Sequence, residues 1–293
     1  MTAETDPFEA DGLALRALSL DDAPRGAALN AEIGWNQTED DWRYMLANGA
    51  GYGRTNPDGK LIASALSLCY GEFAWVCMVL VSPDYRRRGL ASDLMRRVTD
   101  DLLARNIVPG LDATPDGREV YKLLGYRDIY RLDRMWAESV GPSGEGGETP
   151  VNIAPMTAGD IDEIAAYDAP GFGGDRRALL AHLRDRAPDQ AHVARAGQWL
   201  AGYVLARDGR EALQIGPVVA EDPDIAIALA RIALDGYQGA AVIDAMGTQK
   251  EFIAWCGKSG FEYQRPYTRM LLGRSEPMDK SHYIFAPAGP ELG

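Results

Sequence analysis

Cysteine and histidine are scarce in this chain, with only three of each among 293 residues. The cysteines, Cys69, Cys77 and Cys256, have neither the paired spacing of a disulfide framework nor the close spacing of zinc ligands. Their scarcity argues against a structural metal site, so no metal is predicted. It is typical of a protein in a reducing compartment, which we expect to be the cytoplasm.

Long apolar runs are also missing. No segment approaches the roughly 18 apolar residues that a membrane-spanning helix needs. The first residues, MTAETDPFEADG, are polar and acidic, unlike a secretory signal peptide. We therefore expect no membrane as a partner.

Positive charge is in deficit, with 30 Lys and Arg against 43 Asp and Glu and a net charge of −13. Such a surface disfavours the phosphate backbone of a nucleic acid as partner and is compatible with a cationic one. The 46% hydrophobic and 25% charged composition is that of a soluble globular protein, and the length suffices for two domains.

The most informative stretch runs from Glu72 to Asp101. Residues 73–81, FAWVCMVLV, are apolar at every position, which predicts an interior strand covered on both faces. From Ala91 onward, apolar residues recur at three- and four-residue spacing, which predicts an amphipathic helix. Three arginines and a glycine, Arg86 to Gly89, therefore occupy the join of strand and helix. Unpaired N–H groups and the helix dipole favour an anion there.

This pattern, Arg86-x-x-Gly89-x-Ala91 after Val81-x-Pro83, resembles the acetyl-CoA signature of the Gcn5-related N-acetyltransferase (GNAT) superfamily. The resemblance implies acetyl-CoA as co-substrate, with its pyrophosphate on the amides of the loop and its pantetheine arm along the end of the strand. The implied cofactor-binding residues are Val79, Leu80, Val81, Arg86, Arg87, Arg88, Gly89, Leu90, Ala91 and Ser92. Thr114 stands where many members have an asparagine that bonds CoA.

Acyl transfer also needs a proton for the departing thiolate, and in the family a tyrosine supplies it. Tyr121 stands at the matching position, four residues before Gly125-Tyr126, so the resemblance implies that it is the general acid. Packing in a helix core is the alternative. A general base is less clearly indicated: Glu72 and Asp112 are the candidates, and either could instead be a solvated carboxylate at a strand end. Cys77 has no histidine nearby in sequence to activate it as a nucleophile.

The acceptor site is expected along the first helices. Trp35, Glu39 and Trp75 are the candidate substrate-binding residues, because indole faces and carboxylates suit an organic cation. Trp42 lies in the same region, but we interpret it as a core residue.

The second half of the chain repeats the first. Three pairs of segments correspond: Met156 to Ile161 with Leu18 to Ala23, Val242 to Ala245 with Gly110 to Ala113, and Thr268 to Met270 with Asp133 to Met135. We predict an N-terminal catalytic domain at residues 1–139, a flexible linker at 140–150, a second domain at 151–275 and a tail at 276–293. The fold class expected is α/β (α+β). It is a tandem acyl-CoA N-acyltransferase fold, with a mixed, mostly antiparallel sheet flanked by helices in each copy.

The second repeat has lost the arginine loop. It carries Glu221, Asp222 and Asp224 where the first repeat has arginines, and these would repel a polyphosphate. This arrangement is similar to that of two-lobed bacterial acetyltransferases with a divergent C-terminal lobe, the holothin acyltransferases among them.

The sequence thus predicts a monomeric or homodimeric N-acetyltransferase that transfers an acetyl group to a primary amine of a small molecule by direct attack. Two alternatives stay open. One is acetylation of protein lysines or N-termini, and the other is an acyl-CoA sensor without catalysis.

Overall fold

The computed structural model describes residues 6, 8, 11–140, 151–280 and 282–293. The predicted linker, apart from Val140, lies outside the described residues. The chain forms two compact units, residues 1–109 and residues 110–293, which are described separately below.

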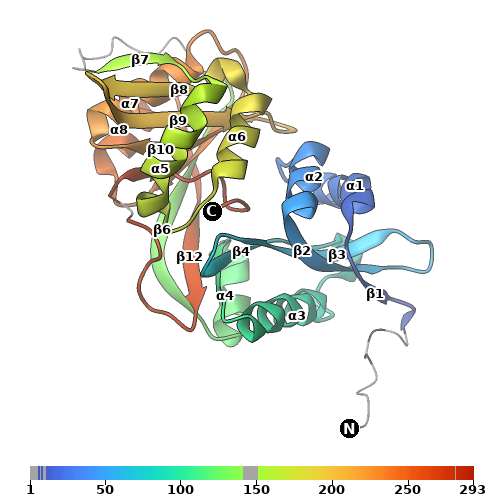
Figure 1. Ribbon diagram of the computed structural model, residues 1–293. Coiled ribbons are helices and arrows are strands. Elements are labelled where there is room, and N and C mark those ends of the chain that lie inside the picture. Colours follow the sequence, from blue (N-terminus) through green and yellow to red (C-terminus); the bar gives the residue numbers. More distant parts are fainter. Residues whose placement is uncertain (1–5, 7, 9–10, 141–150, 281) are drawn as a thin grey trace. The chain divides into compact units, whose positions relative to one another are not determined.

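The first unit is a four-stranded antiparallel sheet in the order β1-β2-β3-β4. Helices α1 and α2 cover one face of this sheet and α3 covers the other (Figure 1). The elements are β1 (Ala14–Ala17), α1 (Ala23–Ile33), α2 (Glu39–Asn48), β2 (Gly49–Thr55), β3 (Leu61–Cys69), β4 (Phe73–Val81) and α3 (Leu90–Ala104).

Local sequence explains where α2 begins. The Thr38 hydroxyl accepts a hydrogen bond from the Asp41 N–H, and the Asp41 carboxylate accepts one from the Thr38 N–H, which is a capping box. Trp42 is fully buried and its ring lies directly over Gly26 of α1, where any side chain would collide with it. The interpretation of Trp42 as a core residue is therefore confirmed.

The second unit contains the sheet β5-β12-β6-β11-β10-β9-β8-β7, with the short strand β13 attached to β10. The pairing of β10 with β11 is parallel, and the other pairings within this unit are antiparallel. Its elements are β5 (Val108–Ala113), α4 (Pro115–Leu123), β6 (Tyr126–Ala137), β7 (Asn152–Pro155), α5 (Ile161–Phe172), α6 (Arg177–Arg186), β8 (His192–Ala196), β9 (Trp199–Arg207), β10 (Leu213–Ala220), α7 (Pro223–Leu234), β11 (Ala241–Met246), α8 (Lys250–Lys258), β12 (Glu262–Leu272) and β13 (Ile284–Ala286).

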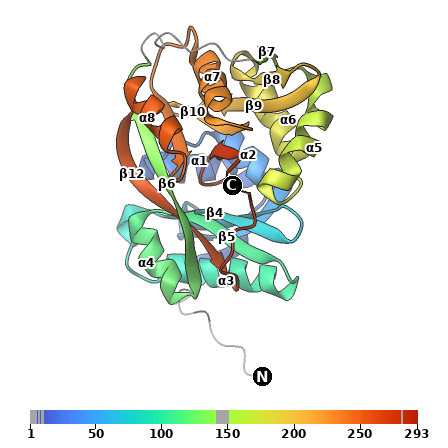
Figure 2. The same cartoon turned by 90° about the vertical axis from the view of Figure 1, so that its left-hand side faces the viewer.

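The two repeats exchange a strand inside this unit. Strand β12, from the second repeat, lies beside β6 (Figure 2) and pairs with both β5 and β6 of the first repeat. In turn, β6 pairs with β11 of the second repeat. The compact units therefore do not follow the limits of the repeats, on which the predicted domains were based.

Two buried ion pairs join the repeats at the exchanged strands. Arg134 of the first repeat donates to Asp244 of the second at 2.7 and 2.8 Å. Arg269 of the second repeat donates to Asp112 of the first at 3.0 and 2.8 Å. In each pair the two residues lie directly opposite each other on neighbouring strands. The pairs are thus equivalent under the repeat.

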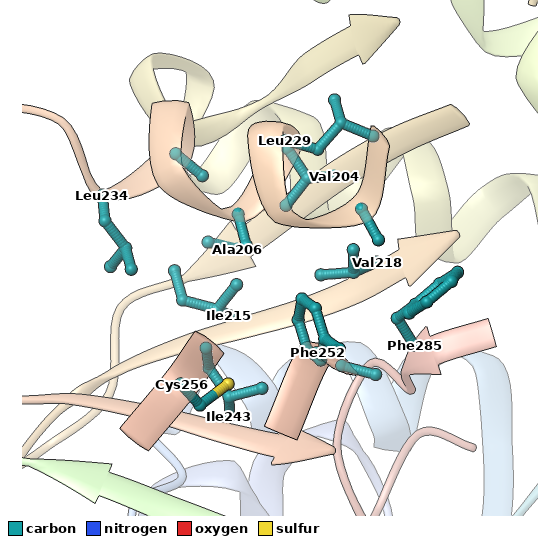
Figure 3. Close-up of a cluster of buried hydrophobic side chains, with 14 of the residues drawn as sticks. Val204, Ala206, Ile215, Val218, Leu229, Leu234, Ile243, Phe252, Cys256 and Phe285 are labelled. Carbon is teal, nitrogen blue, oxygen red and sulfur yellow. The ribbon is translucent and has the colours of Figure 1, made fainter. Parts of the chain in front are cut away.

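A hydrophobic core of the second unit lies between α7, α8 and the central strands (Figure 3). Leu229 of α7 packs with Val204 and Val218 of the sheet, and Phe252 of α8 meets Phe285 of β13 edge-on at 5.6 Å. The segment containing β13 is thus part of the core.

Candidate active site

The arginine-rich join has the strand-loop-helix structure that the sequence predicts. Strand β4 ends at Val81, a short 3-10 helix covers Pro83–Tyr85, and α3 begins at Leu90. Arg87 and Gly89 have φ angles of 62° and 88°, in the left-handed region. This conformation costs glycine little, and it directs successive backbone N–H groups toward one side of the loop.

The backbone N–H groups of this loop are available to a ligand. Among the described residues, no acceptor pairs with the N–H of any residue from Arg87 to Ser92. The side chains of Arg86, Arg87 and Arg88 are exposed, and Arg88 lies over the ring of Tyr85 at 5.1 Å. Unpaired donors, a helix N-terminus and three guanidinium groups suit a diphosphate, so this loop fits the phosphate end of coenzyme A.

Strand β4 contains a bulge that the sequence does not reveal. Met78 has a φ of 48°, and the pairing with β3 passes from Ser64 opposite Leu80 to Leu66 opposite Cys77. The Ser64 hydroxyl donates to the Met78 carbonyl oxygen at 2.7 Å and holds this carbonyl in place. The bulge redirects the last residues of the strand, among which Val79 and Val81 are partly exposed.

Tyr121 lies on α4, with its ring centroid 6.1 Å from that of Tyr126. Its hydroxyl makes no hydrogen bond with any residue in the described parts of the chain. Burial raises the pKa of Tyr121 well above its usual range, so the hydroxyl keeps its proton at neutral pH. Thr114 caps this helix and accepts a hydrogen bond from the Gly117 N–H at 3.2 Å.

The two carboxylates considered as general bases lie in different surroundings. Glu72 is exposed in the turn before β4. Asp112 is buried and paired with Arg269; burial raises its pKa, and the guanidinium opposes that shift. Because the equivalent pair, Arg134 with Asp244, occurs in the repeat that lacks the arginine loop, the pairing favours a structural role for Asp112.

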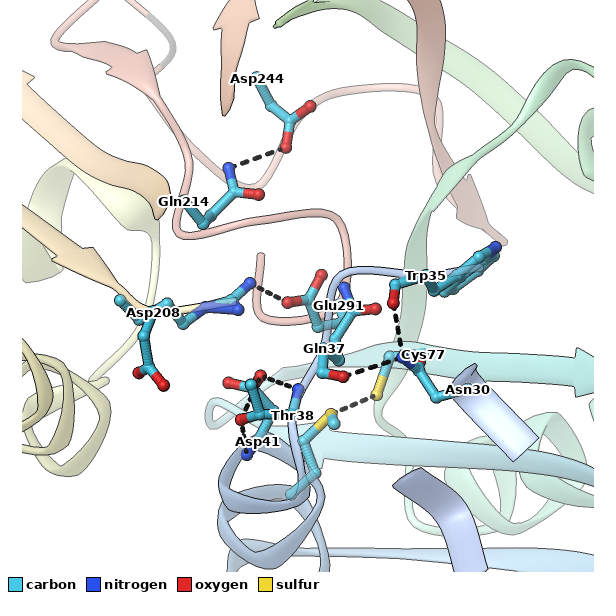
Figure 4. A network of polar contacts seen from close by, with 12 residues as sticks. Asn30, Trp35, Gln37, Thr38, Asp41, Cys77, Asp208, Gln214, Asp244 and Glu291 are labelled. Atoms are coloured by element: carbon cyan, nitrogen blue, oxygen red, sulfur yellow. Dashed lines mark hydrogen bonds and ion pairs between the residues drawn. The ribbon is translucent and has the colours of Figure 1, made fainter. Parts of the chain in front are cut away.

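The candidate acceptor residues are partly engaged in local contacts. The carbonyl oxygen of Trp35 accepts a hydrogen bond from the Asn30 side chain at 2.9 Å (Figure 4). Glu39 accepts from Arg43 one turn later at 3.0 Å. Trp75 lies within β4 and is only 2% exposed. The side chain of Trp35 is half-buried, so of the two candidate tryptophans it is the more accessible.

Two features distinguish the join of β10 and α7 in the second repeat from the arginine loop of the first. The Asp222 carboxylate accepts a hydrogen bond from the Ile225 N–H at 2.9 Å, so the chain itself caps α7. Beyond Ile215, β10 no longer pairs with β11 and pairs instead with β13, Val218 opposite Ala286. In the first repeat, the resemblance places the pantetheine arm at the corresponding end of β4. In the second repeat, the corresponding end of β10 is thus occupied by β13.

These features define an acyltransferase fold in two copies, and the chain belongs to the GNAT superfamily as a tandem member. The acetyltransferase (GNAT) family matches residues 18–126, and an acetyltransferase (GNAT) domain matches residues 164–286. The predicted fold class and the predicted family are confirmed.

The chain is similar to two proteins over most of its length. It is 29% identical to a holothin acyltransferase of a Pseudoalteromonas species over 89% of this chain and 87% of that protein. It is 24% identical to YitH of Bacillus subtilis, which is named an uncharacterized N-acetyltransferase, over 90% of this chain and 93% of that protein.

Solved structures share the fold. A GCN5-related N-acetyltransferase from Sphaerobacter thermophilus has a TM-score of 0.63 at 18% identity, covering 92% of this chain and 99% of that one. A tandem GNAT protein from the clavulanic acid biosynthesis pathway has a TM-score of 0.63 at 14% identity, covering 90% and 99%.

Within the described residues, no helix combines the length and the apolar character needed to span a bilayer. Within the same residues, no cluster of three or more histidine, cysteine or acidic side chains is arranged to hold a metal ion.

Proposed function

We propose that this protein is an acetyl-CoA-dependent N-acetyltransferase that acetylates a primary amine of a small molecule by direct attack, with Tyr121 as the general acid. The observation that carries the proposal is the row of unpaired N–H groups from Arg87 to Ser92 at the start of α3. Two relatives named as an acyltransferase and an acetyltransferase support transfer over mere binding.

Coenzyme A, when bound, supplies the thioester that donates the acetyl group. The residues of this chain do the rest. The loop N–H groups and the arginines hold the diphosphate, and backbone amides near Val79 and Leu80 polarise the thioester carbonyl. The amine nitrogen bonds to the carbonyl carbon as the carbon–sulfur bond breaks. Tyr121 gives its proton to the departing sulfur, and the amine's proton leaves to Glu72 or to a water chain that reaches solvent.

Thiol release against a panel of amines tests the proposed function. The expected result is release of free thiol that depends on both acetyl-CoA and a small amine, with the acetylated product detected by mass spectrometry. Binding of acetyl-CoA by calorimetry without thiol release would instead identify a sensor. Turnover with peptides but with no small amine would identify a protein acetyltransferase.

Gly89→Val should weaken the binding of acetyl-CoA. A β-branched residue in the left-handed region costs about 1–2 kcal/mol, and its side chain would stand between the loop amides and a phosphate. We expect the KM for acetyl-CoA to rise about ten-fold or more, with a smaller change in kcat. Gly59→Val is a matched control, because Gly59 also has a positive φ but lies in an exposed hairpin turn. Wild-type affinity for the cofactor in Gly89→Val would contradict the loop geometry.

One coenzyme A should bind per chain. The second repeat offers no free helix start, because Asp222 caps α7, and β13 occupies the end of β10. Isothermal titration calorimetry with acetyl-CoA measures the stoichiometry directly. A second binding event that survives Gly89→Val would show that the second repeat also takes the cofactor.

A further inference from the structure

The loop that presents its backbone N–H groups to a ligand has few contacts of its own to hold it in place. Among the described residues, no acceptor pairs with the N–H groups of residues 87–92. The side-chain hydrogen bonds within the loop are long and exposed: Arg86 donates to the Val81 carbonyl oxygen at 3.3 Å, and Arg88 to that of Asp84 at 3.4 Å. A loop that keeps its N–H groups free for a ligand therefore depends on contacts from outside itself.

Phe8 supplies such a contact from a distant part of the sequence. A Cβ built on Gly89 would lie 3.8 Å from Phe8 Cζ, and apart from the adjacent residues it would meet no other atom of the described chain within 4 Å. The Phe8 ring is half-buried, whereas Gly89 is exposed. Both residues belong to the first unit. The tip of the ring thus borders the loop at its glycine.

Phe8 is itself held firmly. Arg54 of β2 is fully buried, and its guanidinium lies over the Phe8 ring at 4.4 Å. The Phe8 N–H donates to the Asp6 carboxylate at 3.0 Å, and Asp6 in turn pairs with Arg54 at 2.8 Å. The Phe8 carbonyl oxygen accepts hydrogen bonds from the N–H groups of Asp11 at 3.2 Å and Leu13 at 3.1 Å. The ring, the N–H and the carbonyl of this residue are therefore all engaged.

The guanidinium that lies over Phe8 also holds the first turn of α3. Arg54 donates to the carboxylate of Asp93, in that first turn, at 2.7 Å. Arg97, one turn further along the helix, pairs with Asp93 at 3.2 Å and with Asp6 at 3.6 Å. These two guanidinium groups and two carboxylates balance one another in charge. The cluster therefore joins Phe8 and the start of α3 to one buried support.

We propose that Phe8 is a positioning residue for the cofactor: its ring, held by Arg54, keeps the loop at Gly89 in the conformation that binds a diphosphate. This proposal rests on the proposed function, because it takes coenzyme A as the ligand of the loop. Phe8 acts through the loop and not by touching the cofactor. Without the ring, the loop adopts conformations that do not bind, and the apparent affinity falls with the fraction that remains competent.

Calorimetry with coenzyme A, together with competition by inorganic diphosphate, tests the effect on binding. In Phe8→Ala we expect the Kd for coenzyme A to rise about 5- to 10-fold, as it would if about 10–20% of the protein kept a competent loop. The affinity for diphosphate, which lacks the adenosine, should fall by the same factor, because the defect lies in the loop. Phe8→Met, which is long and apolar, should recover part of both affinities. Leu20→Ala, at an exposed apolar residue of the same unit, is the matched control and should bind as wild type does.

Limited proteolysis by trypsin without any ligand tests the loop independently of the proposed function. Trypsin cleaves after arginine and lysine, and Arg86, Arg87 and Arg88 are exposed. We expect cleavage at these arginines to be at least about five-fold faster in Phe8→Ala than in wild type, because cleavage follows the population of the open loop. Cleavage after Lys258, an exposed residue of the second unit, should keep its wild-type rate, which distinguishes loop opening from general unfolding.

Faster cleavage together with equal losses of affinity for coenzyme A and diphosphate supports the proposal. Equal cleavage in wild type and Phe8→Ala, or unchanged affinity for both ligands, overturns it. A loss confined to coenzyme A also overturns it, since Phe8 would then contact the adenosine. If the wild-type protein binds no coenzyme A, the proposed function fails, and the cleavage rates alone decide whether Phe8 holds the loop. Phe8→Leu replaces Phe8→Ala if the latter does not fold.

Discussion

Replacing Tyr121 with phenylalanine is expected to lower kcat at least about 100-fold, because positioned general acids typically contribute 10²- to 10⁴-fold. Phenylalanine keeps the ring contact with Tyr126 and removes only a hydroxyl that makes no hydrogen bond with the described residues. The fold should therefore persist. The KM for acetyl-CoA should be nearly unchanged, since the loop at Gly89 is untouched.

The measurement is steady-state kinetics at saturating amine and acetyl-CoA. Tyr263→Phe, at an exposed tyrosine of β12, is the control and should keep wild-type kcat. The raised pKa of Tyr121 adds a second expectation. Its hydroxyl keeps its proton beyond the ordinary tyrosine pKa of ~10, so kcat should show no decline from its ionisation below that pH. A kcat for Tyr121→Phe equal to that of wild type would exclude Tyr121 as the acid.

Asp244→Ala is expected to lower the free energy of unfolding by about 3–5 kcal/mol, because it leaves the Arg134 guanidinium buried without its partner. The loss should be large because this pair joins β6 of one repeat to β11 of the other. Replacing both residues, Arg134→Met with Asp244→Leu, should recover much of the loss, since no charge then remains buried. Urea denaturation monitored by circular dichroism gives these values.

An exposed ion pair provides the control for that experiment. Asp162 pairs with Arg177 at 2.6 Å, and both side chains are more than half exposed. Exposed pairs contribute about 0–1 kcal/mol, so Asp162→Ala should have little effect. If Asp244→Ala were no more destabilising than Asp162→Ala, the pair would not stabilise the exchanged strands.

Local features of the fold could be predicted from the sequence. The apolar run of β4 reflects burial of both faces of that strand, and the three- and four-residue spacing of apolar residues in α3 reflects burial of one face of that helix. Thr38 marks the start of α2 because its side chain and backbone form the capping hydrogen bonds. The strand-loop-helix structure around Gly89 could be predicted for the same reason.

Long-range features could not be predicted. Strand β12 of the second repeat corresponds to β6 of the first. The order of residues does not reveal that each of these strands pairs with strands of the other repeat. The bulge at Met78 depends on how β4 aligns with β3, and its residues have ordinary strand character. The sequence places Asp279 only in a tail, because the residues it contacts, Arg269 and Tyr130, lie on strands that come together only in the fold. A repeat-by-repeat comparison of Asp112 with Asp244 and Arg269 with Arg134 could have suggested both ion pairs.

The exchange of β6 and β12 has a consequence for the history of this protein. After a gene duplication, a copy that loses its catalytic residues is usually free to decay or to be deleted. Here deletion of the second copy would remove β12, the neighbour of both β5 and β6 of the first copy. The second repeat is therefore needed to complete the sheet around β5 and β6, whatever its own residues bind.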